Sequence, residues 1–554
     1  DVPPAWAAIV SAAIEKDPER RLPSMAQALR LCHEAHGSPT VTMPAIPPPP
    51  VEHKPPADSF RHRVGLEKVE QGRHTGYSVA VLRLKNLSGG EDGEVFSEGL
   101  SEELINSLAK LSNIRVLART SSFKFQDGQT DPKEIRAKLG ATHVIDGSIR
   151  KQGNRVRILV RLTNTELETV EWSERYDRQY EDVFAIQDEI GAAVAHVLHV
   201  ALNESGGRGT RIRTTVPEAL DLYLKGRYQL NRSNPVELGN AVRSFEEATR
   251  LDPSFALAYS NLADAYLVAA HWTVIPLHDA RVRAKAAAQR ALDLDPDLAE
   301  AHSSMAAVSL SEDWSNFPAA AKGFEKAIAL NPSYAPAYFW YGQLILRPLG
   351  RIQEALAAAK CAMELDPLSP AMRVASAYTY YYAGDFDRAI REAQSSLDVD
   401  PNYIEAAYLQ GMAHIAAGNP AKAVDLMNDS IARYGPRPWQ LSELGVAQAR
   451  LGDIAEARAT AQQIEAGGSV QNLPPMAAGY VYIALRDFDN ANRCLERAYE
   501  MKDYRLLSLI GNPSFPEVFT LPEFDRHARR LREIAQSSLT QTHLSGLSLG
   551  GPRR

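Results

Sequence analysis

Residues 327–367 read AIALNPSYAPAYFWYGQLILRPLGRIQEALAAAKCAMELDP. The stretch holds one period of a pattern in which a helical run ends in Leu-Asn-Pro, Leu-Asp-Pro or a close variant. The same ending recurs along the chain, with spacings of 43, 36, 35, 34 and 35 residues, at Pro253, Pro296, Pro332, Pro367, Pro401 and Pro436. A period near 34 residues with helical periodicity predicts a stack of helix pairs.

Each predicted pair places small and aromatic residues at fixed positions. Around Pro332 these are, on the helix before it, Ala320, Phe324 and Ala327, and on the helix after it, Tyr338, Tyr341, Gly342 and Ile345. The pattern closely resembles the tetratricopeptide repeat, and about eight repeats fit residues 217–503. The resemblance implies an all-α superhelix, an α-solenoid, whose concave groove binds a peptide or helix of a protein partner. A capping helix is predicted over residues 504–535 and a disordered polar tail over 536–554.

The candidate groove residues are Lys225, Asn261 and Glu300. Lys225 and Asn261 match two positions of the tetratricopeptide proteins that clamp a chaperone's terminal carboxylate, but the third repeat offers Glu300 and Ser304 where that clamp requires cations. The sequence therefore argues against such a partner. A second feature of the repeats is a run of tyrosines that either forms an aromatic wall for a partner or belongs to the core, namely Tyr378, Tyr380, Tyr381 and Tyr382.

Residues 77–202, before the repeats, have a different pattern. Short apolar runs at 78–82, 114–117 and 143–145 alternate with a helical segment at 96–111. This alternation predicts an α/β domain with a partly parallel sheet. Residues 149–162 predict a hairpin, and residues 203–216 a linker to the repeats.

Several strings in this region resemble the TolB-like amino-terminal domain. They are Ala80-Val-Leu, Asn86-Leu-Ser, Phe96-Ser-Glu-Gly-Leu-Ser-Glu-Glu-Leu, Arg119-Thr-Ser-Ser-Phe, Asp146-Gly-Ser-Ile-Arg, Trp172-Ser-Glu-Arg-Tyr-Asp and Phe184-Ala-Ile-Gln-Asp-Glu-Ile. In bacterial proteins that domain lies between a signalling module and a tetratricopeptide array. The resemblance implies this architecture and supplies no catalytic residues.

One strand of the predicted hairpin has a basic face. Residues 155–162 alternate strictly, so that arginines and apolar residues lie on opposite faces. The candidate anion patch, for phosphate or an acidic partner, consists of Arg150, Lys151, Arg155, Arg157 and Arg161. The alternative is a solvated strand face whose charges prevent edge pairing.

Residues 1–36 show two helical patterns joined by Asp17-Pro18-Glu19-Arg20-Arg21. They resemble the last two helices of the large lobe of bacterial Ser/Thr protein kinases, in which the arginine matched by Arg21 pairs with a glutamate after the activation loop. The alternative is an ordinary helix pair. No kinase catalytic motif occurs in the chain, which begins at Asp1 and is expected to be the carboxy-terminal part of a longer kinase. ATP and Mg²⁺ would belong to that absent lobe.

Residues 37–76 are rich in proline and predict a semi-rigid linker.

Composition excludes several classes of protein. Lys and Arg number 61 and Asp and Glu 68, for a net charge of −7, without the basic excess of nucleic-acid binders. The three cysteines are far apart, which argues against a disulfide framework or a paired-Cys zinc site and indicates the cytoplasm. The sequence contains no run of about 20 apolar residues, the length that a membrane span requires.

These features favour a non-catalytic, partner-binding scaffold that forms the regulatory part of a signalling Ser/Thr kinase and holds no cofactor or metal. Two alternatives remain open. The intact parent protein is an ATP-dependent protein kinase, or the TolB-like domain senses a phosphorylated small molecule. The partner's identity and the oligomeric state are not encoded in any recognisable motif.

Overall fold

The computed structural model describes residues 77–541 except residues 110, 112–113, 126–130, 181–182, 199–213, 215, 233–234, 272–273, 313 and 467–473. The predicted helix pair of residues 1–36, with Asp17, Pro18 and Arg21, lies outside the described residues. So do the proline-rich segment 37–76 and residues 542–554 of the predicted tail.

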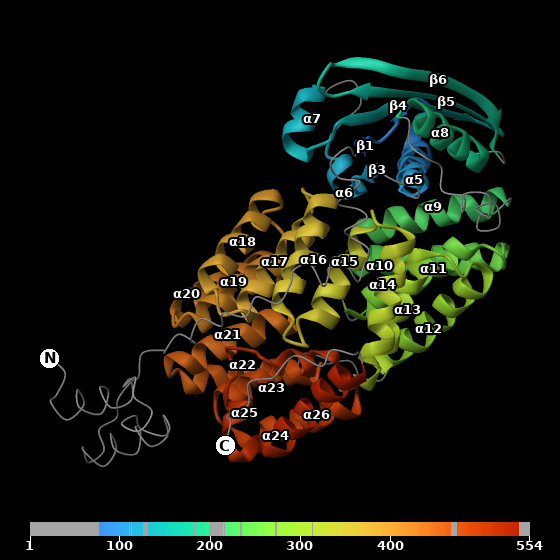
Figure 1. Cartoon of the computed structure of the whole chain (residues 1–554). Helices are drawn as coiled ribbons and strands as arrows, with labels where there is room; N and C mark the ends of the chain where they lie inside the picture. The colour runs from blue at the N-terminus through green and yellow to red at the C-terminus, as the bar shows by residue number, and fades with distance from the viewer. Residues whose placement is uncertain are drawn as a thin grey trace, which may run out of the picture. The chain divides into compact units, whose positions relative to one another are not determined.

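The first part of the described chain is a sheet with strand order β3-β1-β4-β5-β6 (Figure 1). Its strands are β1 (Tyr77–Val81), β2 (Lys85–Asn86), β3 (Ile114–Val116), β4 (His143–Gln152), β5 (Arg155–Asn164) and β6 (Thr169–Gln179). β1 runs parallel to β3 and β4, and β2 pairs in parallel with β4. β4, β5 and β6 pair antiparallel. The structure thus has the partly parallel sheet and the hairpin that the sequence predicts.

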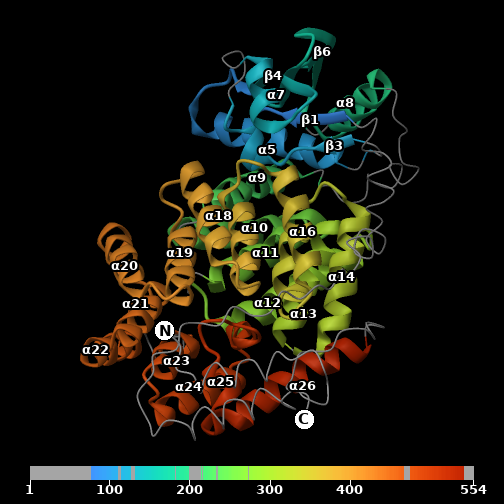
Figure 2. The ribbon, with the colours of Figure 1, turned by 60° about the vertical axis from the view of Figure 1, so that its left-hand side comes forward.

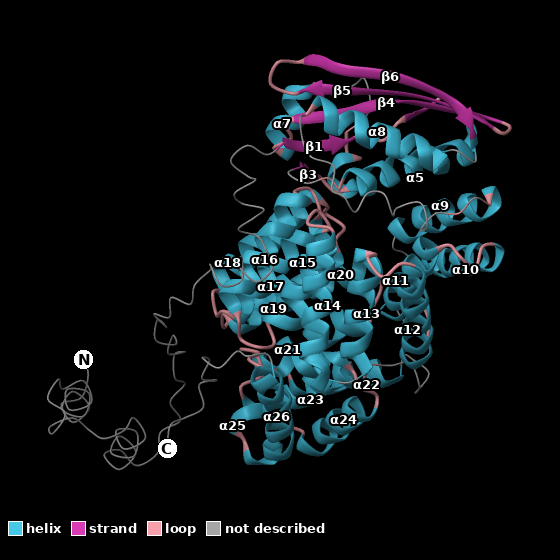
Figure 3. Ribbon diagram, turned by 45° about the vertical axis from the view of Figure 1, so that its right-hand side comes forward, coloured by secondary structure: helices cyan, strands magenta, loops and turns pink. Residues whose placement is uncertain are grey.

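Helices cover both faces of the parallel strands (Figure 3). Val79 and Val81 of β1 share a core with α5 (Gly90–Leu108) and α8 (Val183–Val197), whereas Ala80 and Leu82 share a smaller core with α7 (Pro132–Leu139). The four residues alternate because successive side chains of a strand point to opposite faces. A short helix, α6 (Arg119–Ser122), follows β3.

Eight consecutive helix pairs follow within the described residues (Figure 1). They are α9 (Pro217–Arg232) with α10 (Pro235–Leu251), α11 (Ala256–His271) with α12 (Leu277–Leu294), α13 (Ala299–Glu312) with α14 (Phe317–Leu330), α15 (Ala335–Trp340) with α16 (Ile352–Leu365), α17 (Pro370–Tyr382) with α18 (Phe386–Val399), α19 (Ile404–Ala416) with α20 (Pro420–Tyr434), α21 (Pro438–Leu451) with α22 (Ile454–Ala466), and α23 (Pro475–Ala484) with α24 (Phe488–Glu500).

Each of these helices contacts the next one along the chain, and the first helices of neighbouring pairs also contact each other. This is the nearest-neighbour stacking of a solenoid, in which no pair buries its apolar faces alone. The first helices line the concave side of such a stack, so we call the surface that they form the groove. Among the described residues, no helix is both long and apolar enough to cross a bilayer.

Two irregularities of the repeat have local causes. The long spacing between Pro253 and Pro296 accompanies an extended connection after α11 and the 18-residue helix α12. In the fourth pair, η4 (Tyr341–Leu346) continues α15 as a π-helix, in which the Arg347 amide donates to the carbonyl oxygen of Gly342 at 3.0 Å. Nothing in the sequence pattern indicated the π-helix.

Gly342 is a close-packing position between the two helices of the fourth pair. A Cβ atom there would lie 3.5 Å from Cβ of Ala358 and 3.6 Å from the carbonyl oxygen of Ala355. We therefore expect Gly342→Ala to be tolerated and Gly342→Leu to lower the unfolding free energy by about 1–3 kcal/mol through overpacking. Urea unfolding of both variants measures the difference. Equal midpoints for the alanine and leucine variants would contradict this packing.

The chain beyond α24 returns across the solenoid. It forms η5 (Tyr504–Leu509), α25 (Glu517–Thr520), η6 (Pro522–Phe524) and α26 (Asp525–Gln541). α26 packs on η3 (Trp314–Asn316) and α14 of the third pair (Figure 2). The Arg281 guanidinium of α12 donates to the carbonyl oxygens of Met501 and Lys502, at 3.0 and 2.6 Å. The eighth pair and the carboxy-terminal helix thus contact the second and third pairs.

Candidate protein-binding groove

The groove between the second and third pairs is acidic. The Ser304 hydroxyl on α13 hydrogen-bonds the Asp264 carboxylate on α11 and lies 2.9 Å from the carbonyl oxygen of Glu300. Burial raises the pKa of Asp264 to about 7, and the nearby Glu300 carboxylate acts in the same direction. Sequence reasoning missed Asp264, although it lies one helical turn after Asn261.

The three predicted groove residues lie on the first helices of successive pairs. Lys225 on α9 is exposed, while Asn261 on α11 and Glu300 on α13 are half-buried. The Asn261 side chain donates to the carbonyl oxygen of Leu257 in its own helix, at 3.0 Å. With Asp264 beside Glu300, this surface is unsuited to a carboxylate ligand, because like charges repel.

Further along the groove, two tyrosines of α17 hold the segment that follows α24. The fully buried Tyr381 hydroxyl lies 2.7 Å from both Asn512 Oδ1 and Ser514 Oγ. The Tyr382 hydroxyl donates to the carbonyl oxygen of Ser508 at 2.6 Å. All four tyrosines of the predicted run belong to a hydrophobic cluster, as the core alternative expects, and two of them also hydrogen-bond the chain's own segment 508–514.

α21 and α23 complete this contact. The Tyr480 hydroxyl donates to the carbonyl oxygen of Arg505 at 3.0 Å, and the Tyr480 ring stacks on Phe515 with centroids 4.8 Å apart. Arg450 donates to the carbonyl oxygen of Ser514 at 2.8 Å and pairs with Glu517 at 2.5 Å. We call Tyr381, Tyr382, Arg450 and Tyr480 the tyrosine clamp.

A charged cluster joins the α/β region to the first repeat. On α9, the Arg227 guanidinium pairs with Glu102 of α5 at 2.5 Å and also with Glu103. The Tyr223 hydroxyl donates to Glu103 Oε1 at 2.8 Å. Arg227, Glu103 and Tyr223 are all buried. These contacts join α5 to α9 in one interface. The described α/β region and the repeats belong to a single compact unit.

The string at residues 96–104 has a structural explanation in this interface. A Cβ atom at Gly99 would lie 2.5 Å from Cδ2 of Leu224, so glycine lets α5 approach α9. Ser101 Oγ accepts from the Leu84 amide at 2.9 Å, and Ser97 Oγ donates to the Leu84 carbonyl oxygen. Ser97 and Ser101 fix the segment after β1. Glu102 and Glu103, from the same sequence string, form the ion pairs with Arg227. The signal for this interface was a pair of adjacent glutamates, Glu102 and Glu103, that follow a glycine by three and four residues on the same helix.

A second contact places the α/β region on the proline corners of the repeats. The Ala118 amide donates to the carbonyl oxygen of Leu365 at 2.8 Å. Ser121 Oγ donates to Asp366 Oδ1 at 2.6 Å and accepts from the Leu368 amide at 2.7 Å. Burial raises the pKa of Asp366 to about 6, while its bond from Ser121 acts in the opposite direction. The recurring Leu-Asp-Pro ending thus also serves as a docking point.

Removing the Ser121 hydroxyl leaves the Leu368 amide without its acceptor, and it removes one of several hydrogen bonds to the Asp366 carboxylate. We expect Ser121→Ala to lower the unfolding free energy by about 1–3 kcal/mol. Chemical denaturation checks the value, and Ser173→Ala, at an exposed serine of β6 in the same region, is the matched control. A Ser121 variant as stable as the control would show that this contact contributes nothing.

The predicted anion patch divides between two faces of the sheet. Arg150, Arg155, Arg157 and Arg161 share the outer face, where Arg150 lies directly opposite Arg157. Asp177 pairs with Arg155 at 2.9 Å and Arg157 at 2.8 Å, and Asp146 pairs with Arg161 at 2.6 Å. These acids offset part of the basic charge.

Lys151 does not lie on that outer face. Its ammonium is 3.7 Å from the ring centroid of Tyr180 and 3.0 Å from Asp221 Oδ1 on α9. The reason is strand parity, because Lys151 follows Arg150 directly and so points to the opposite face. Lys151 therefore belongs to the contact between the α/β region and the repeats.

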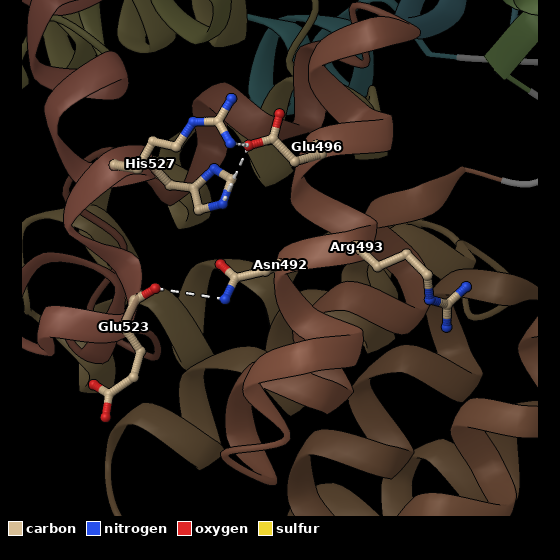
Figure 4. A pocket seen from close by; sticks show the side chains of 6 residues that line it. Asn492, Arg493, Glu496, Glu523 and His527 are labelled. Carbon is tan, nitrogen blue, oxygen red and sulfur yellow. Dashed lines mark hydrogen bonds and ion pairs between the residues drawn. The ribbon is translucent and has the colours of Figure 1, made fainter.

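A pocket of about 340 Å³ lies between α24 and the carboxy-terminal helices (Figure 4). Its lining is polar, and members of the lining pair with one another. Glu496 pairs with Arg526 at 2.9 Å, and Asn492 donates to the Glu523 carbonyl oxygen at 3.5 Å. In the described ranges, no three His, Cys, Asp or Glu side chains gather as around a metal ion.

Comparison with known families identifies the repeats. A sequence profile of the tetratricopeptide repeat matches residues 315–370 and 374–438. These residues include α14 to α16, most of α17, and α18 to α20. The chain therefore contains tetratricopeptide repeats, as the proline spacing predicts.

Curated relatives match over a limited stretch. The chain is 34% identical over 187 residues to "Putative adenylate cyclase 3" of Rhizobium meliloti (strain 1021), covering 34% of this chain and 32% of that protein. It is 26% identical over 170 residues to "Transcriptional regulator HilA" of Salmonella typhimurium, covering 31% of this chain and 30% of that protein. The chain thus spans about a third of the length of the curated relatives it matches.

Solved structures of tetratricopeptide proteins are also similar. A tetratricopeptide repeat protein from Parabacteroides merdae matches with a TM-score of 0.35 and 15% identity, covering 48% of this chain and 99% of that one. Yeast Tom70 matches with a TM-score of 0.36 and 16% identity, covering 58% of this chain and 69% of that one.

Proposed function

We propose that this chain is a non-catalytic scaffold that binds a protein partner in the groove of its tetratricopeptide repeats. The observation that carries the proposal is how the groove holds a peptide segment. Side-chain donors of the first helices bind the main-chain carbonyl oxygens of Arg505, Ser508 and Ser514. Every peptide has such carbonyls, so donors arranged for them suit a peptide ligand.

The matched relatives support an accessory role. One relative is named as an adenylate cyclase and another as a transcriptional regulator, and each shares less than a third of its length with this chain. Similarity to proteins with such different names favours regulation or partner binding over either activity. This reasoning extends the proposal to signal transduction.

Affinity capture with the full chain as bait, followed by mass spectrometry, tests the scaffold. A Glu300→Lys bait reverses charge in the groove, and Glu247→Lys makes the same change on α10, a second helix. A partner retained by the wild-type and Glu247→Lys baits but lost by Glu300→Lys is the expected result. Partners bound equally by all three baits would place recognition outside this acidic part of the groove.

We further propose that the α/β region is a TolB-like domain and that the chain is the regulatory part of a cytoplasmic Ser/Thr kinase. The support is the order of Asp17-Pro18 and Arg21, the proline-rich segment, the strings of residues 80–190 and the repeats. On this proposal the parent protein is an ATP- and Mg²⁺-dependent kinase. Reading the gene upstream of Asp1 tests it, because a start codon immediately before Asp1 would refute the fusion.

A second candidate function belongs to the arginine face of the sheet. Arg150 and Arg157 are directly opposite in register, so a bound phosphate would relieve repulsion between like charges. Calorimetry with a panel of nucleotides, comparing wild type with the Arg155→Ala, Arg157→Ala variant, tests this sensing role. Heats that are absent, or the same in both proteins, would refute it.

A further inference from the structure

The loop between η5 and α25 occupies the tyrosine clamp in the manner of a bound peptide. This loop, residues 511–516, reads GNPSFP. Three of its four central residues, Asn512, Ser514 and Phe515, are buried against first helices, whereas Gly511 and Pro516 at its ends are exposed. All of its contacts with the clamp come from α17, α21 and α23, which belong to three different repeats.

Asn512 is the most completely bound side chain of the loop. Its Oδ1 accepts from the Tyr381 hydroxyl at 2.7 Å and from the Ser514 amide at 3.0 Å. Its Nδ2 lies 3.4 Å from the Tyr382 hydroxyl and 3.2 Å from the Ser508 carbonyl oxygen. Asn512 uses both the acceptor and the donor of its amide; aspartate lacks the donor and leucine lacks both, so the site favours asparagine over either.

Phe515 and Ser514 supply the remaining contacts. The Phe515 ring stacks on Tyr480 with an interplanar angle of 18°. The Ser514 carbonyl oxygen accepts from Arg450, a contact that any residue at that position would provide. The clamp thus recognises an asparagine, then a main-chain carbonyl, then an aromatic ring, within four residues.

Both flanks of the loop are held in place by buried side chains of their own. Leu506, Leu507 and Leu509 before it and Val518 after it are buried and anchor the two sides. Gly511 has φ of 71°, a left-handed conformation that glycine enters and leaves at little cost. Local opening of such short segments requires less free energy than global unfolding.

We propose that the tyrosine clamp is a binding site for a partner peptide with an Asn-Pro-Ser-Phe type of turn, and that residues 511–516 are its intramolecular competitor. The inference rests on the proposed groove function and adds the ligand's chemistry and the location of its site. The partner segment replaces the loop through the same amide, carbonyl and ring contacts. Groove binding at the clamp is therefore restrained until a peptide with this chemistry is abundant or the loop opens.

A labelled peptide with the sequence of residues 509–518, LIGNPSFPEV, tests this inference by fluorescence anisotropy with the full chain. In the Asn512→Ala, Phe515→Ala variant the loop competes weakly, so we expect about tenfold tighter peptide binding than in wild type, since apparent affinity scales with the fraction of open sites. Adding Tyr381→Phe to that variant removes the gain. Adding Tyr380→Phe, on the same helix, leaves it unchanged.

Two results would overturn the inference. One is a loop variant with wild-type circular dichroism that binds the peptide no better than wild type. The other is peptide binding that survives Tyr381→Phe undiminished. If the loop variant does not fold, hydrogen exchange of the wild-type chain replaces it. Excess peptide then must accelerate exchange at the Asn512 and Phe515 amides, which bond within the loop region, and unchanged protection there refutes the proposal.

These outcomes separate the inference from the scaffold function. Partners captured by the wild-type chain while the peptide fails to bind would refute the clamp and leave the scaffold intact. Capture that fails for every bait, with the peptide bound, would show a peptide site without the proposed partner.

Discussion

Replacing Arg227 by methionine is expected to lower the free energy of unfolding by about 3–5 kcal/mol, the typical cost of removing one partner from a buried ion pair. Methionine matches the apolar stem of the arginine side chain and lacks the guanidinium, so the loss reports the charge and the hydrogen bonds of that group. Glu102 and Glu103 then remain in the interface without the guanidinium that they face at 2.5 Å or closer. The Tyr223 hydroxyl and the Asn106 amide stay bonded to Glu103.

Urea unfolding measures the stability change, and hydrogen exchange locates it. In the Arg227→Met variant, protection should fall first in α5 and α9, because these two helices form the interface. Lys225→Met makes the same chemical change two residues away at an exposed position and should be nearly neutral. If the two variants unfold at the same urea concentration, the charged cluster does not hold the α/β region on the repeats.

The solenoid follows from the sequence because its signal is local and periodic. Each proline corner joins one helix pair to the next along the chain, so the spacing from Pro332 to Pro367 reports the structure without knowledge of distant contacts. Strand parity likewise separates Arg155 and Arg157 from the apolar face. The same rule applies to Lys151, which directly follows Arg150 and therefore points to the opposite face, toward Asp221. A grouping by charge alone overlooked this assignment.

The contacts between segments far apart in the sequence were not predictable from a local pattern. Tyr381 and Asn512 are 131 positions apart, and Ser121 and Asp366 are 245 positions apart. Neither member of these pairs carries a signal for the other. Gly99 shows the same limit, because its glycine is explained only by Leu224 on the opposing helix. Periodicity predicts which helices form, whereas the surfaces they present to remote segments depend on the curvature of the whole stack.

The second large effect concerns Glu443, which lies on α21 below the tyrosine clamp and is 3% exposed. Burial raises the pKa of this carboxyl to about 8, although its hydrogen bond with Tyr408 acts in the opposite direction. An unfolded glutamate has a pKa near 4.3. Between these two values the folded chain holds a proton that the unfolded chain has released, so the Glu443 contribution to stability falls as pH rises.

We therefore expect Glu443→Gln, which keeps the shape without the ionisation, to become progressively more stable than wild type from pH 5 to pH 8. The difference should grow by about 1.4 kcal/mol for each pH unit. Comparing the two proteins at each pH cancels the contributions of Asp264 and Asp366, whose raised pKa values affect both chains alike. Urea midpoints at four pH values measure the trend, and Glu456→Gln, at an exposed position of α22, should show none. A difference between wild type and Glu443→Gln that stays constant with pH would mean that this carboxyl is ionised in the folded chain, and that the groove beneath the clamp is hydrated rather than closed by residues 511–516.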